Sequence, residues 1–442
     1  MKIFSLIIIF IMSATLVAGQ NNQIKKNVLS DSDKESAVNS ISKLLYDNYI
    51  FPEVSVKMEN YVKSKLSENN YDTITDPQEF AQILTTDLQS VSNDKHIRVQ
   101  FNPDQIKHIK ENNTNNDEEI TQEYIDQLKS ANYFFKKVEI LSGNIGYIDF
   151  RQFGPGEQIK DKVASVMGFV ENCDALIFDM RYNGGGDPTG IQVISSYLFG
   201  DEPVHLNDLY FRPNDTTQEF WTLKDIKGKR MPDVPVFVLT SSFTFSGAEE
   251  FSYNLQNLKR AAIVGETTGG GAHPGGMNIV DDNFLMFVPM GRAINPITKT
   301  NWEGTGVSPD INISSTQALV KAHILALEKI NMKSNDVKLK EISDWLIESL
   351  SATLENVYLS QEILNEYCGD YGDRKISFEN GKLYYQRNGR QKFELTAMTE
   401  DTFMFSDIEY FRIQFLKDDS GKIIELKGLY SDGHSDSSKR KY

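Results

Sequence analysis

The sequence predicts an α/β protein built from a small N-terminal helical domain, a central α/β domain with a mostly parallel sheet, and a small C-terminal β domain. Three observations predict this class. Apolar residues recur at helical spacing near the N-terminus, buried strands alternate with helices through the middle, and short strands separated by turn residues fill the C-terminal part. We expect the three domains at 30–91, 92–335 and 357–442.

The first 19 residues read as a secretory signal peptide. Lys2 precedes an apolar run, Ile3 to Met12, and small residues end at Gly19. The run is short for a bilayer span, which needs about 20 residues. We therefore expect an exported protein, periplasmic or extracellular, with no membrane span after cleavage.

The composition and motifs argue against nucleic acid, nucleotide cofactors and zinc as ligands. The 442 residues carry a net charge of -16, which repels nucleic acid. The glycine runs match no nucleotide-binding pattern, and no Cys/His spacing indicates a zinc site, so we expect neither a cofactor nor a bound metal. Two cysteines, Cys173 and Cys368, do not make a disulfide scaffold, and the sequence leaves open whether they are bridged. It also leaves the oligomeric state open, an oligomer included.

The N-terminal helices follow from spacing and caps. Val38, Ile41 and Leu45 share one helix face, and Asp76-Pro77 is a typical helix start. A half-buried strand, 97–101, then follows the segment that contains Asp94 and His96.

The central domain alternates strands and helices. Strands are predicted at 175–180, 234–239 and 261–265, with a helix at 246–258 between the last two. The Asn380-Gly381 pair then predicts a hairpin in the C-terminal β domain, which we expect to be an accessory module.

Two strand ends carry candidate chemistry, because α/β sheets place their sites there. Gly184 to Gly186 can expose N–H groups to an oxyanion, although on local sequence alone a tight strand-to-helix turn is the preferred explanation. Ser246 ends a strand-to-helix turn, where it is either a nucleophile or a helix cap, and Ser241 and Ser242 are rival nucleophiles.

A serine nucleophile needs a base. His96, beside Asp94, and His273, in a glycine-rich loop, are both candidates. Glu303 is either a solvated loop residue or an acid that orients the base. The remaining histidines are expected on the surface: His108, His205, His323 and His434.

Several motifs occur in order between about Ser30 and Leu327. They are Asp94-x-His96, Asp179-Met180-Arg181-Tyr182-Asn183-Gly184-Gly185-Gly186, the segment from Thr240 to Phe251 with the following Gly265 to Gly270, and Trp302-Glu303-Gly304-x-Gly306-Val307. Together they resemble the tail-specific, or C-terminal-processing, serine peptidases. The Asp94-x-His96 element is similar to that of the branch with the tricorn core peptidase and the interphotoreceptor retinoid-binding protein.

The resemblance implies a role for each matched residue. Ser246 becomes the nucleophile, His96 the general base and Glu303 the acid that holds it, while Gly247 and Gly185 supply oxyanion N–H groups. The lysine of the bacterial Ser–Lys dyad is missing, and there is no room for an inserted PDZ domain.

The function implied is a serine peptidase that hydrolyses peptide bonds in extended or C-terminal segments of peptide or protein substrates. Two alternatives stay open. One is a non-catalytic protein that binds apolar ligands or peptides, as the retinoid-binding relative does, and the other is an esterase that uses the same serine.

Overall fold

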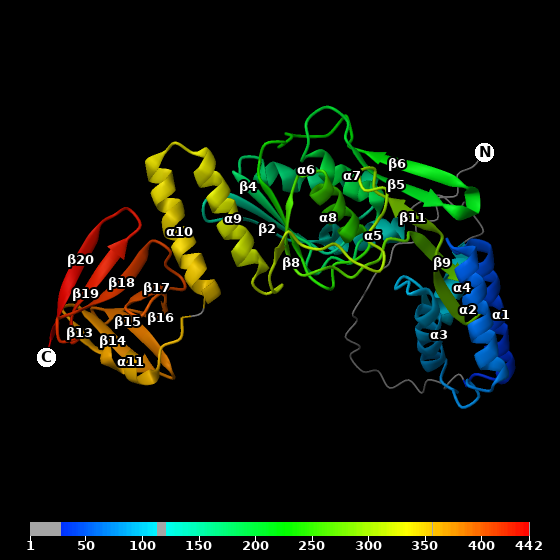
Figure 1. Ribbon diagram of the computed structural model, residues 1–442, viewed down its shortest axis with the longest axis horizontal. Coiled ribbons are helices and arrows are strands. Elements are labelled where there is room, and N and C mark those ends of the chain that lie inside the picture. Colours follow the sequence, from blue (N-terminus) through cyan, green and yellow to red (C-terminus); the bar gives the residue numbers. More distant parts are fainter. Residues whose placement is uncertain (1–27, 113–120, 356, 442) are drawn as a thin grey trace.

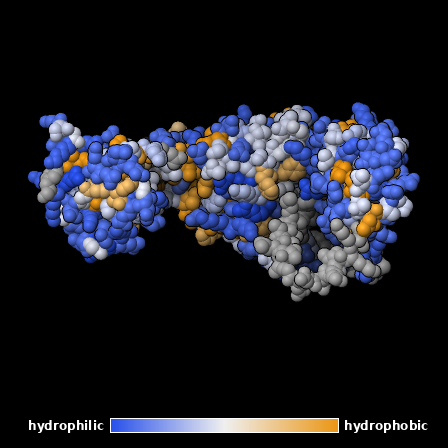
Figure 2. Space-filling view, turned by 90° about the horizontal axis from the view of Figure 1, so that it is seen from below, coloured by the Kyte–Doolittle hydropathy of each residue, from blue (hydrophilic) through white to orange (hydrophobic). Residues whose placement is uncertain are grey.

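The computed structural model describes residues 28–112, 121–355 and 357–441, which form three parts arranged in a row (Figure 1). The expected signal peptide lies outside the described residues. Figure 2 shows hydrophilic residues over most of one face and a narrow waist where the C-terminal part joins the rest. Among the helices of the described ranges, none is long and apolar enough to cross a membrane.

The N-terminal helices share their core with a small sheet. Buried Ile41 and Leu45 pack in one cluster with Phe284 and Met286 of that sheet, so this part is not purely helical. The Asp76 side chain accepts the N–H groups of Gln78 and Glu79 at the start of the third helix. The elements are α1 (Asp31–Asn48), α2 (Pro52–Ser67), α3 (Pro77–Ser92) and the sheet β1 (Arg98–Phe101), β10 (Phe284–Pro289) and β9 (Gly275–Ile279), in that spatial order.

The central sheet has six strands, in the order β12-β8-β7-β4-β3-β2. Its strands are parallel except for the antiparallel pair of β2 and β3, which confirms the mostly parallel sheet. Their bounds are β2 (Phe135–Leu141), β3 (Ile145–Phe150), β4 (Ala175–Asp179), β7 (Val236–Thr240), β8 (Ala262–Gly265) and β12 (Ile311–Asn312).

Helices cover both faces of this sheet. Ile148 and Phe178 pack on one face with α6 (Gly156–Val170), α7 (Pro188–Ser196) and α8 (Gly247–Asn257). Tyr147 and Ile177 pack on the other face against α9 (Ala318–Lys333), followed by α10 (Val337–Glu355). The remaining elements before α10 are α4 (Pro103–Asn112), α5 (Gln122–Ser130), two 3-10 turns and a second small sheet of β11 (Gly291–Ile294), β5 (His205–Phe211) and β6 (Thr216–Trp221).

The C-terminal part is a closed eight-stranded antiparallel barrel preceded by the short helix α11 (Gln361–Glu366). The predicted small β domain is therefore confirmed, and closure removes the unpaired strand edges that a meander would leave. Its strands are β13 (Gly369–Tyr371), β14 (Arg374–Glu379), β15 (Lys382–Arg387), β16 (Lys392–Ala397), β17 (Thr402–Phe405), β18 (Phe411–Lys417), β19 (Ile423–Tyr430) and β20 (Ser435–Lys441).

Arg412 attaches the barrel to α10. Its guanidinium lies 3.7 Å above the ring of Trp345 and donates to Glu348, at 2.5 Å, and to Ser349, at 2.6 Å. Elsewhere, both cysteines are free, with Cys173 buried in the main core.

Candidate active site

Ser246 stands at a strained turn between β7 and α8. Its backbone has φ 52° and ψ -122°, a conformation that a residue with a side chain seldom adopts. The turn is fixed from both sides, because Thr244 Oγ1 donates to the Met180 carbonyl at 2.8 Å and Phe245 N–H donates to the Asn183 carbonyl at 3.2 Å. This geometry resembles a nucleophile elbow, which presents a serine hydroxyl at the edge of a sheet.

Glu249, one turn into α8, ties Ser246 to the loop at 268–271. Its carboxylate accepts the N–H groups of Ser246 (2.8 Å), Gly270 (2.6 Å) and Gly271 (2.8 Å) and the hydroxyl of Thr268 (2.5 Å). Burial raises the pKa of Glu249 although these hydrogen bonds oppose the shift. The sequence analysis missed this residue, and its place three residues after a serine that opens a helix was the signal that could have found it.

The glycine run after β4 lies against the nucleophile. A Cβ atom on Gly185, whose φ is +107°, would lie 2.8 Å from Ser246 Cβ and 2.7 Å from the Gly247 nitrogen. Only glycine fits that approach. The Gly185 N–H itself donates to Asn183 Oδ1 at 2.9 Å.

Asp94 is the buried centre of the histidine cluster. Its Oδ2 lies 2.7 Å from His273 Nδ1 and accepts a hydrogen bond from the Tyr49 hydroxyl at 3.2 Å. Its Oδ1 accepts a hydrogen bond from the backbone N–H of His96 at 3.0 Å. Burial alone would raise the pKa of Asp94, but the hydrogen bond with His273 and the nearby imidazole of His96 hold that pKa below its usual value. The carboxylate is therefore a fixed negative charge beside both histidines.

His96 lies beside the nucleophile segment. Its ring packs on Phe245, the neighbour of Ser246, with 4.6 Å between centroids, and on Phe287 with 5.7 Å. Both ring nitrogens are buried without a hydrogen-bond partner among the described residues, and Nδ1 lies 3.6 Å from Asp94 Oδ1. The ring is thus held by packing, and its nitrogens remain available.

Glu303 is brought to this cluster by the turn that begins at Trp302. The Trp302 indole donates to the Gly271 carbonyl at 2.7 Å, and Ala272 N–H donates to Glu303 Oε2 at 2.5 Å. With 18% of its side chain exposed, Glu303 is not a fully solvated loop residue. Burial and the charge of Asp94 raise its pKa.

The other candidates are less available for chemistry. His273 is buried and committed to Asp94, and Asp94 and Glu303 raise its pKa despite the opposing effect of burial. Ser241 donates its hydroxyl to the Arg181 carbonyl at 2.5 Å, whereas Ser242 is exposed. The surface position expected for His323 is wrong, because α9 packs on the sheet and buries this histidine, whose Nε2 lies 2.7 Å from the Ser142 carbonyl.

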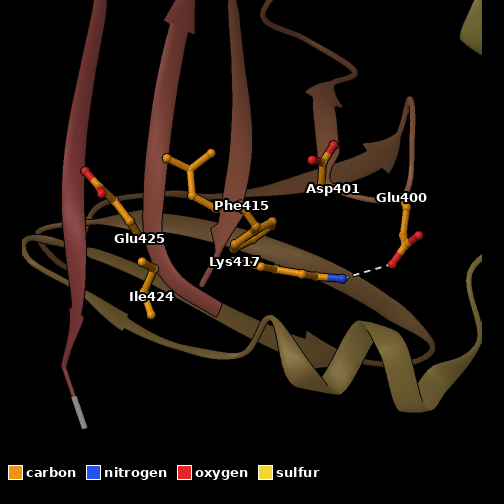
Figure 3. Close-up of a pocket in the computed structure, with 7 residues that line it drawn as sticks. Glu400, Asp401, Phe415, Lys417, Ile424 and Glu425 are labelled. Atoms are coloured by element: carbon orange, nitrogen blue, oxygen red, sulfur yellow. Dashed lines mark hydrogen bonds and ion pairs between the residues drawn. The ribbon is translucent and has the colours of Figure 1, made fainter. Parts of the chain in front are cut away.

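A surface pocket on the barrel offers no comparable arrangement. Figure 3 shows Lys417 pointing toward Glu400, with which it is paired at 2.9 Å, and Phe415 and Ile424 among the residues that line the pocket. The other acidic residues of the lining are Asp401 and Glu425, so the pocket combines carboxylates with apolar surface and includes no serine or histidine.

Comparison with known families agrees with this geometry. Residues 144–313 match the model of peptidase family S41, and residues 30–141 match the model of the N-terminal domain of Peptidase_S41 in eukaryotic IRBP. This chain belongs to peptidase family S41. The resemblance inferred from the motifs is therefore confirmed, and the second match covers the N-terminal helices that this resemblance already included.

Two curated relatives align with parts of this S41 chain. The tail-specific protease of Haemophilus influenzae is 29% identical over 150 residues, which cover 32% of this chain and 19% of that protein. Chloroplastic carboxyl-terminal-processing peptidase 2 of Arabidopsis thaliana is 26% identical over 174 residues, covering 38% and 32%. The alignments thus span a third or less of these relatives.

Solved structures similar to this S41 chain include a peptidase of Parabacteroides merdae, at 18% identity and a TM-score of 0.43, with 64% of this chain and 90% of that one covered. The tricorn protease has 14% identity and a TM-score of 0.39, with 72% and 37% covered.

Proposed function

We propose that this chain is a serine peptidase that cleaves extended or C-terminal peptide segments, with Ser246 as nucleophile, His96 as base and Glu303 as the acid that orients it. One observation carries the proposal: Ser246 occupies a strained elbow, and the ring of the residue before it packs on His96. A buried helix cap would not require that backbone conformation.

The chemistry follows from these positions. His96 takes the hydroxyl proton while Ser246 Oγ forms a bond to the carbonyl carbon of the substrate. The C–N bond then breaks, and the leaving amine takes the proton from His96. Water, deprotonated by the same ring, releases the acyl group from Ser246.

Two backbone N–H groups would hold the oxyanion. Gly247 N–H starts α8, where the helix dipole favours negative charge. Because Gly185 N–H already donates to Asn183, we assign the second donor to Gly186, whose nitrogen would lie 3.0 Å from a Cβ atom on Gly247. The Gly186 carbonyl and nitrogen both face this helix start.

The proposed compartment is outside the cytoplasm, supported by the signal-like segment at 1–19. The proposed substrate class, protein C-termini or other extended segments, is supported by the family and by the names of the two curated relatives.

Parallel peptide and ester assays test the function. Mass spectrometry should find cleavage of extended peptides by the full chain, lost in Ser246→Ala and retained in Ser242→Ala, a matched change at an exposed serine of the same loop. Turnover of esters alone would instead indicate an esterase. No turnover of either by folded protein would favour the binding function.

A further inference from the structure

Three side chains beside the nucleophile offer ligand atoms to one point. Asp94 and His96, between α3 and β1, and Glu303, between β11 and β12, each place one such atom within 4.8 Å of the others. All three are largely buried, with 1%, 9% and 18% of their side chains exposed. Two carboxylates and one imidazole are a donor set that Zn²⁺ accepts.

Two of the three side chains at this point, His96 and Glu303, have buried polar atoms without a partner among the described residues. Both His96 ring nitrogens and Glu303 Oε1 are buried without hydrogen-bond partners in the described part of the chain. Buried polar atoms are nearly always paired, so these unpartnered atoms need an explanation. An ion at this point would take one His96 ring nitrogen and Glu303 Oε1, and the other ring nitrogen would lie on the far side of the ring.

The opposite oxygen of each carboxylate is already fixed. Asp94 Oδ2 is held by His273 and Tyr49, and Glu303 Oε2 by the Ala272 N–H. Metal-binding carboxylates are themselves hydrogen-bonded to the protein. Asp94 Oδ1 also accepts the backbone N–H of His96 at 3.0 Å, and its second lone pair remains for the ion. His273 thus serves as an outer partner of the site.

The spacing fits a small divalent ion after a modest closure. Donors at about 2.0–2.2 Å from Zn²⁺ in a tetrahedron lie about 3.3–3.6 Å apart. Asp94 Oδ1 and His96 Nδ1 are 3.6 Å apart, within that range. An ion would also offset the repulsion between the two buried carboxylates.

We propose that Asp94, His96 and Glu303 form a reversible site for Zn²⁺ or a similar divalent transition metal, and that the bound ion inhibits the enzyme by occupying His96. The inhibition rests on the proposed peptidase function, because His96 must be free to take the Ser246 proton. Metal binding itself does not depend on that function.

Calorimetric titration of Zn²⁺ into the tag-free full chain carrying Ser246→Ala tests the site directly. We expect one ion per chain, and at least tenfold weaker binding after adding His96→Gln or Glu303→Gln, with Mg²⁺ giving no saturable signal. His205→Asn is the matched control, because it removes a histidine paired with one carboxylate, Asp208, at 2.6 Å, and it should leave the affinity unchanged. Circular dichroism checks that each variant is folded.

The outcomes separate the site from the function. Absence of one-to-one binding, or affinity that survives both His96→Gln and Glu303→Gln, overturns the metal site and leaves water as the partner of the orphaned atoms. In the wild-type chain, Zn²⁺ should slow fluorophosphonate labelling of Ser246 at least tenfold, and EDTA should restore it. Binding without any labelling, even in EDTA, supports the site and contradicts the peptidase, whereas labelling unaffected by bound Zn²⁺ overturns the inhibition.

Discussion

His273 Nδ1 lies 2.7 Å from Asp94 Oδ2, so a second histidine, separate from the proposed base, holds the buried carboxylate at the centre of the site. Glu303 Oε2 lies 3.5 Å from the same nitrogen. The two carboxylates raise the pKa of His273 against the opposing effect of burial, and the charged imidazole that they favour weakens their mutual repulsion. Its role is therefore to position the acids, and His96 remains the group that faces the nucleophile segment.

His273→Gln should destabilise the chain more at pH 6 than at pH 9. The pKa of His273 is raised on folding, so its stabilisation is complete below its unfolded pKa, about 6.5, and is lost as the pH rises through the folded value. Removing one partner of a buried pair costs about 3 kcal/mol. Urea denaturation of wild type and variant at both pH values measures the loss in the free energy of unfolding. An equal loss at pH 6 and pH 9 would show that His273 is uncharged.

Glu249→Gln should slow reaction of Ser246 about 100-fold, because the amide cannot accept all four hydrogen bonds that align the elbow with the loop at 268–271. The neighbouring Glu250→Gln is the matched control and should leave the rate unchanged. Kinetics of covalent labelling compare the two. Equal rates in both variants would mean that the tie to the loop does not position Ser246.

Glu250→Gln should stabilise the protein at neutral and alkaline pH. Burial raises the pKa of Glu250 to about 8, and its Oε1 has no hydrogen-bond partner among the described residues. When the pKa of a carboxyl is higher in the folded than in the unfolded state, the protein loses stability as the pH rises. The loss begins near the unfolded pKa, about 4.5, and is complete above the folded pKa. The gain on substitution is about 3 kcal/mol at pH 7 and vanishes near pH 4. Thermal unfolding across this range checks the trend, which a pH-independent gain would contradict.

Arg412→Met should loosen the barrel from α10 without changing the reaction of Ser246. The Arg412 side chain is 4% exposed and stacks on Trp345, whereas its ion-pair partner Glu348 is 65% exposed, so the substitution costs about 2 kcal/mol, mostly from the lost stacking. Lys417→Met, at the more exposed pair with Glu400, should cost less than about 1 kcal/mol. Differential scanning calorimetry of the two variants would compare their losses in stability. A slower labelling of Ser246 in Arg412→Met would mean that the barrel supports the site.

Local patterns were enough to predict the central sheet. The apolar runs at β4 and β7 have every residue buried, as strands covered on both faces must be, and the motif order placed Ser246, His96 and Glu303 as candidates. Barrel closure could not be predicted, because it depends on pairing β13 with β20 across the whole domain. Short-range turn signals contain no such information.

The arrangement around Asp94 also escaped prediction. Its contact with His273 joins residues 179 positions apart, and the tie between Glu249 and Gly270 joins residues 21 apart in a loop without regular structure. Burial of His323 depended on which face of α9 meets the sheet. These two contacts and the burial of His323 depend on long-range packing. The spacing of residues within one segment does not predict them.

The most direct test of the account is the rate at which a fluorophosphonate modifies the full chain, followed by intact mass and peptide mapping. The account predicts one adduct, on Ser246, absent in Ser246→Ala and formed at least about 100-fold more slowly in His96→Gln. An adduct on another serine, or an undiminished rate in folded His96→Gln, would contradict it.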